Sequence, residues 1–110
     1  MGYKVLIKRP DEKIGHMTWI AGHLENLQSH VEGHIEVVTI CTSPTVVMIV
    51  NEEGKIRDLP KNFMMGSTPG FRDMIRGTVV VCGVDGEDFA DIPIDRPTWK
   101  ALLKSWGNEV

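Results

Sequence analysis

Apolar positions in this chain gather into short runs of strand length, and these runs are rich in β-branched residues. The clearest is 46–50, VVMIV, which holds no polar position and closely follows Pro44. β-Branched residues fit a pleated, packed surface, and an unbroken apolar run indicates a strand that is covered on both faces. We therefore expect a buried central strand here.

The residues after this run predict a hairpin. Residues 51–54, NEEG, have turn chemistry, because Gly54 can take a positive φ without a Cβ penalty. Residues 55–57 alternate polar, apolar, polar, as a strand with one solvated face does. Pro60 cannot donate to a ladder and ends the second strand. We interpret segment 45–62 as the piece around which the rest of the chain is arranged.

Four further segments have strand patterns, namely residues 3–8, 14–20, 34–41 and 77–84. Met17 and Trp19 alternate and should share one face of their strand. Gly15 predicts an irregularity or a close backbone approach, and Gly83 predicts a bulge. Residues 60–75 show no clean period and predict a long loop with its tip at 66–70, whereas 85–88 predict a turn and 92–94 an extended segment.

Helical periodicity occurs twice. In residues 23–31, Leu24, Leu27 and Val31 form one apolar stripe, and Gly33 is placed to end the helix. The second helix starts at an Asp95 N-cap with Pro97 in its first turn and ends at Gly107. Its apolar face consists of Trp99, Leu102, Leu103 and Trp106.

These elements predict one α+β domain over residues 1–110. We expect a mainly antiparallel sheet of five or six strands, with one helix after the second strand and one at the C-terminus. The chain has 110 residues, of which 42% are apolar and 25% charged, so it can form a hydrophobic core without disulfides or bound metal ions.

Charge and hydropathy exclude several classes of function. The net charge of −3 lacks the basic excess of a nucleic-acid binder. No apolar run approaches the about 18 residues that span a bilayer. The first ten residues read as a strand rather than as a secretion signal. We therefore expect a cytoplasmic protein that binds neither nucleic acid nor membrane.

Cysteines and histidines offer little chemistry. Cys41 and Cys82 each end an apolar run, and we expect a pair of buried, reduced thiols, with a disulfide or a reactive thiol as alternatives. His30 and His34 have a ligand-like spacing, but Gly33 intervenes, and no cysteine or carboxylate cluster accompanies them. We expect no metal and no cofactor, and His16 and His23 are likewise interpreted as solvated or hydrogen-bonded.

Five residues are candidates for binding. Asn62, Arg72 and Asp73 bracket the long loop, where binding residues tend to lie. The structural alternative is that Asn62 caps the loop backbone and Arg72 pairs with Asp73. Trp99 and Trp106 share a helix face that either packs in the core or forms a homodimer or partner surface. No catalytic constellation is readable, so we expect no enzyme.

Several segments, in order, resemble a known family. They are YKVLIK, LENLQSHVEGHIEVV, VVMIVNEEGKIRDLPKN and FRDMIRGTVVVCGVDGEDF, which together span residues 3 to 90. They are similar to domain-of-unknown-function family 3846, small uncharacterised proteins of bacteriophages, plasmids and integrated elements of Gram-positive bacteria. The most specific parts are NEEGK, the LPKN at 59–62 and the D-x-I-x-G-T pattern at 73–78. Where that family usually has an Arg after the Asn, this chain has Phe63.

The resemblance implies a context and no mechanism. It implies an accessory protein of a phage or mobile element in a bacterial cytoplasm. Our first hypothesis is a non-enzymatic protein that binds a host macromolecule, in counter-defence or host modulation. The alternative is a small-ligand module, such as a nucleotide-sequestering protein, that uses loop 60–76 with Asn62 and Arg72.

Overall fold

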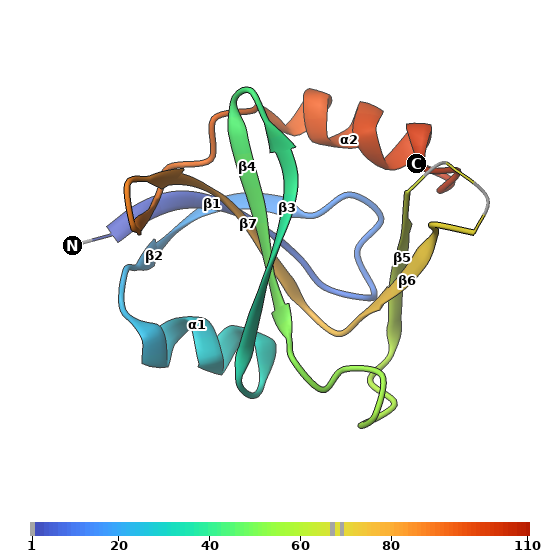
Figure 1. Cartoon of the computed structure of the whole chain (residues 1–110), viewed down its shortest axis with the longest axis horizontal. Helices are drawn as coiled ribbons and strands as arrows, with labels where there is room; N and C mark the ends of the chain where they lie inside the picture. Colours follow the sequence, from blue (N-terminus) through green and yellow to red (C-terminus); the bar gives the residue numbers. More distant parts are fainter. Residues whose placement is uncertain (1, 67, 69) are drawn as a thin grey trace.

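An antiparallel sheet forms the centre of the computed structural model, which describes residues 2–66, 68 and 70–110 (Figure 1). Six strands make this sheet in the order β2-β1-β7-β4-β3, with β8 paired to β7. Their bounds are β1 Gly2–Lys8, β2 His16–Ala21, β3 Ile35–Thr42, β4 Thr45–Asn51, β7 Val79–Asp85 and β8 Asp88–Ala90. The α+β class is confirmed, as are the helix after the second strand and the C-terminal helix.

The two most apolar strands, β4 and β7, lie side by side in the middle of the sheet. Their alternate side chains enter two different cores. Val47, Ile49 and Val80 pack on one face, and Met48 and Val81 pack on the other. The unbroken run at 46–50 therefore marks a strand covered on both faces, as predicted.

Helix α1, Leu24–Val31, covers the first face of the sheet with Leu27 and Val31. His23 caps its N-terminus, where its Nδ1 accepts the Asn26 N–H at 3.3 Å. Two details differ from the prediction. Leu24, expected on the apolar stripe, is exposed, and the helix ends at Glu32, which takes the left-handed conformation (φ 63°), rather than at Gly33.

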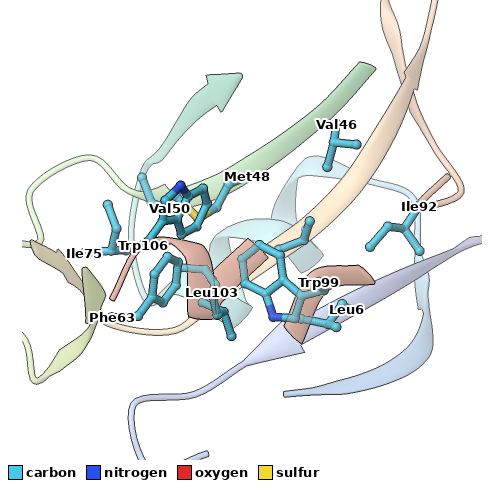
Figure 2. Close-up of a cluster of buried hydrophobic side chains, with 12 residues drawn as sticks. Leu6, Val46, Met48, Val50, Phe63, Ile75, Ile92, Trp99, Leu103 and Trp106 are labelled. Atoms are coloured by element: carbon cyan, nitrogen blue, oxygen red, sulfur yellow. The ribbon is translucent and has the colours of Figure 1, made fainter. Parts of the chain in front are cut away.

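Helix α2, Arg96–Ser105, covers the opposite face (Figure 1). Asp95 is its N-cap, as predicted, and its Oδ1 accepts the Thr98 N–H at 2.9 Å. Trp99 and Trp106 pack with Phe63 in the core (Figure 2), with Phe63 stacked on Trp106 at 6.0 Å and edge-on to Trp99 at 5.6 Å between ring centroids.

The predicted second strand at 55–57 is wrong. Successive backbone bonds, including Arg57 N–H to Glu53 O at 2.8 Å and Leu59 N–H to Gly54 O at 3.0 Å, wind residues 51–59 into turns. Asp58 takes the positive φ, 51°, and Gly54 does not. Gly54 instead lies close to β6, and a Cβ there would make a tight contact of 3.2 Å with the Arg76 carbonyl oxygen.

The predicted loop at 60–75 contains a hairpin. Strands β5, Lys61–Met65, and β6, Asp73–Arg76, pair with each other in a separate two-stranded sheet beside α2. Asn108 fastens this hairpin to the end of α2, since its side chain bonds both Met64 N–H at 2.9 Å and Met64 O at 2.8 Å. Ser67 and Pro69 of the predicted loop tip lie outside the described residues.

Gly83 marks a close approach rather than a bulge. The register of β4 and β7 runs without a shift through Val46 and Gly83. A Cβ at Gly83 would lie 2.4 Å from the Asp91 carbonyl oxygen. A glycine required by close packing and a glycine required by a bulge look alike in the sequence. Only the segment that lies next to the glycine in the fold distinguishes the two.

Candidate functional site

A groove of about 420 Å³ opens beside β3, and we call it the β3 groove. Its walls come from β3, the end of β4, the turn 51–56 and the β5/β6 hairpin. The apolar lining consists of Val38, Val50, Ile56, Met65, Met74 and Ile75. Methionine side chains adapt to varied partners, so this lining suits a binding surface. Ile56 is 84% exposed, which is unusual for an apolar side chain at a groove.

Asn51 holds the turn that forms one wall. Its side chain is buried, its Nδ2 donates to Val31 O at 2.9 Å, and its Oδ1 accepts the Glu53 N–H at 2.7 Å. These bonds tie the end of β4 and the start of the turn to the last residue of α1. The wall is therefore positioned by α1 and the end of β4.

Two ion pairs connect the turn to the hairpin. Lys55 Nζ pairs with Asp73, and Arg76 Nη1 pairs with Asp58 at 3.1 Å and also bonds Leu59 O at 3.1 Å. Exposed pairs of this kind contribute little to stability, about 0–1 kcal/mol each. Their consequence here is that the cations of the groove already have carboxylate partners.

Two carboxylates of the groove remain without a counter-charge. Glu36 on β3 and Glu52 after β4 both line it and are exposed. Neither forms an ion pair with another residue that the structure describes. The open groove is therefore apolar at its base and acidic on the β3 side.

Strand β3 presents a free edge next to this groove. It pairs with β4 along one side, and no described strand pairs with its other side. His34 O accepts the Glu52 N–H at 2.9 Å, and inward and outward backbone groups alternate along an antiparallel strand. The outward N–H and C=O groups therefore belong to Ile35, Val37 and Thr39.

The predicted site residues are not brought together in one place. Asn62 is structural: its Nδ2 donates to Lys8 O at 2.9 Å and Gly77 O at 2.7 Å, and its Oδ1 accepts from Lys8 Nζ at 2.6 Å. Arg72 donates to Trp106 O at 2.9 Å and does not pair with Asp73. Asp73 alone lines the β3 groove.

The two tryptophans belong to the core. Trp99 is 0% exposed, its Nε1–H donates to Ile14 O at 2.8 Å, and Trp106 is buried beside it. Of the two alternatives that the sequence left open, the structure shows the core, and the burial of Trp99 and Trp106 does not fit a partner or homodimer surface. The tryptophan that does face solvent is Trp19 of β2, which is 65% exposed although its neighbour in the pattern, Met17, packs against the core.

Lys8 is the one buried charged side chain among the residues that the structure describes. Burial lowers the pKa of its ammonium group, against the opposing effect of the Glu12 carboxylate. The Nζ also donates to Glu12 O at 2.6 Å and lies 5.5 Å from the Phe63 ring centroid. With Asn62 it joins β1 to β5, which gives the Asn of the LPKN segment a structural role.

Cysteine and histidine positions add no reactive cluster. Cys41 is exposed near the end of β3, so the predicted pair of buried thiols is half wrong, and Cys82 is buried. Both are free thiols. Among residues 2–66, 68 and 70–110, no group of three or more His, Cys, Asp or Glu side chains could hold a metal ion.

Comparison with known families decides the relationship. The family model for Domain of unknown function (DUF3846) matches residues 3–103. The chain belongs to the DUF3846 family. The match extends the resemblance seen in the sequence into α2, so residues 96–103 of the C-terminal helix lie within the matched range. Searches of curated proteins and of solved structures found no match.

Sequence reasoning missed most of the groove. Glu36, Glu52 and Val38 sit in patterns that fit any strand or turn, and only the fold brings them to the β5/β6 hairpin. One signal was available, because Ile56 is an isolated apolar residue among charged neighbours. In the sequence it fits the inward position of a strand.

No helix in the described part of the chain has the length and apolar character to cross a membrane.

Proposed function

We propose that this chain is a non-enzymatic binding protein that takes up an extended segment of a partner protein along β3. The observation that carries the proposal is the free edge of β3 beside an open groove. An extended peptide can add a strand to such an edge, so that main-chain bonds give affinity and alternate side chains give specificity. Val37, on this edge, is 46% exposed and apolar.

The context of the family resemblance extends this proposal to the partner. In a phage or mobile-element setting, the partner is a host protein in the bacterial cytoplasm, and binding serves host modulation or counter-defence. Native proteins usually protect edges with bulges, charges or short strands. β3 has eight residues and one charged side chain, and its register shift lies between Thr39 and Cys41, so positions 35–39 stay open to pairing.

The nucleotide-binding alternative is less well supported. That alternative uses loop 60–76 with Asn62 and Arg72, whose side chains donate to backbone carbonyls: Asn62 to Lys8 O and Gly77 O, and Arg72 to Trp106 O. The two cations that line the β3 groove, Lys55 and Arg76, are paired with Asp73 and Asp58. A thermal-shift screen with nucleotides separates the two proposals, because a ligand that binds only the folded state raises the melting temperature. We expect no shift; a clear one would favour the nucleotide.

Selection from a displayed library of random peptides tests the proposal. Wild-type protein should enrich peptides, and the Val37→Pro variant should not bind them. Proline at this position removes an outward N–H and leaves the hydrogen bonds between β3 and β4 in place. Trp19→Ala is the matched control on the opposite edge strand and should bind normally. Failure to enrich any peptide, or binding that survives Val37→Pro and is lost in Trp19→Ala, contradicts the proposal.

A further inference from the structure

The charge of the β3 groove points to the chemistry of its occupant. Resting on the proposed function, we infer that the segment bound along β3 is basic, with a Lys or Arg side chain opposite Glu36 and an apolar side chain two residues along.

Face geometry decides which partner side chains reach the groove. In a strand added to β3, every second side chain lies on the face that carries Glu36 and Val38. Directly opposite residues have Cβ atoms about 4.5–5.5 Å apart. One partner side chain therefore meets the Glu36 carboxylate, and its neighbour on the same face meets Val38 and the apolar base.

Electrostatics favours a cation at the first of these positions. Glu36 and Glu52 line the groove without an ion pair among the described residues, and Asp73 adds a third carboxylate that already holds Lys55. The lining carries three carboxylates against two cations, so an acidic partner is disfavoured here. The aliphatic stem of Lys or Arg can also lie along the exposed side chain of Ile56 while its charged head stays solvated.

The same reasoning disfavours a second copy of this chain. Residues 35–42, IEVVTICT, contain an acidic residue and no basic one. Pairing of β3 with β3 from another copy would bring no cation to Glu36. The acidic groove therefore selects a different polypeptide.

A charge-reversal selection tests this inference. With the same displayed random library, wild-type protein should enrich peptides with Lys or Arg at alternate positions. Glu36→Lys with Glu52→Lys should weaken their binding about tenfold and shift selection to acidic peptides. Both positions are exposed, so the double variant should fold. Glu87→Lys with Glu109→Lys, which changes net charge equally at exposed sites outside the groove lining, should behave like wild type.

The outcomes separate the inference from the proposed function. One possible result is that the selected peptides depend on Val37 but show no preference for Lys or Arg, and another is that they bind the Glu36→Lys, Glu52→Lys variant as well as wild type. Either result overturns the inference of a basic segment and leaves the proposal of strand addition intact. Peptides that ignore Val37→Pro overturn both. Light scattering measures the oligomeric state. A wild-type dimer that dissociates in Val37→Pro would identify a second copy of this chain as the occupant and overturn the inference of a basic partner.

Discussion

Trp99 is fixed in the core of this protein by aromatic packing and by a hydrogen bond. It is the largest of the side chains that are fully buried; it is edge-on to Phe63 and gives its indole N–H to Ile14 O. Trp19 is as large but mostly exposed. The two tryptophans therefore allow a comparison of identical truncations in opposite environments.

Trp99→Ala should lower the free energy of unfolding by about 3–5 kcal/mol, because it leaves a cavity and an unpaired carbonyl. Trp19→Ala should change it by no more than about 0.5 kcal/mol, as surface substitutions do. Urea unfolding followed by circular dichroism measures both. Equal losses in the two variants would mean that the core is not arranged around α2.

Cys82 makes stability depend on alkaline pH. Burial raises the pKa of its thiol from 9.0 to about 12 in the folded state. The folded chain then keeps a proton that the unfolded chain loses, so this stabilisation is complete below pH 9 and is lost between pH 9 and 12. The slope is about 1.4 kcal/mol per pH unit.

Unfolding free energies measured from pH 8 to 11 in wild type and Cys82→Ala test this. The variant should lose that alkaline slope. Cys41→Ala, at the exposed cysteine, should keep it. Tyr3, whose pKa is raised by burial and by the Cys82 charge, and Lys8, whose pKa is lowered by burial, are present in all three proteins, so the test is the difference in slope between wild type and Cys82→Ala. Equal slopes in these two proteins contradict the assignment.

At the scale of elements, β3 differs on its two sides. Backbone groups of residues 36 and 38 face β4, and those of 37 face the free edge. Val38→Pro should therefore destabilise the fold by about 2 kcal/mol more than Val37→Pro, because only the former removes a ladder bond and leaves an unpaired acceptor on β4. Thermal unfolding of both variants measures this. The reverse order would mean that the inward and outward assignments are exchanged.

Strands and helices were largely predictable, because a β-branched run or a helical stripe is a local signal. The predictions failed where two chemistries share one pattern. Lys55, Ile56 and Arg57 alternate like a strand but lie in turns, since Asp58 takes the left-handed conformation and Leu59 bonds back to Gly54. The β5/β6 hairpin was missed because its apolar residues Phe63, Met64 and Met65 do not alternate.

The candidate site was less predictable than the fold. Asp73 was chosen for its place near a loop, and it does line the groove. Asn62 and Arg72 were chosen by the same rule but serve the backbone of neighbouring segments. A groove built from β3, a turn and a remote hairpin has no local sequence signature, because each segment contributes only a few side chains.

At the scale of the whole molecule, the sheet is covered on both faces and open at β3. Helix α1 runs from the end of β2 to the start of β3, which are the two outer strands of the sheet order. α2 and the β5/β6 hairpin cover the opposite face (Figure 1). The faces are therefore occupied by the chain itself, and the recognition of another polypeptide that we propose uses an edge.

Amide hydrogen exchange followed by NMR tests this claim most directly. In the free protein, the outward amides of Ile35, Val37 and Thr39 should exchange faster than the inward amides of Glu36 and Val38. Addition of a selected peptide should slow exchange at the outward amides and leave those of β2 unchanged. Protection that develops at β2 or α1, with the outward amides of β3 still exchanging freely, would contradict the account.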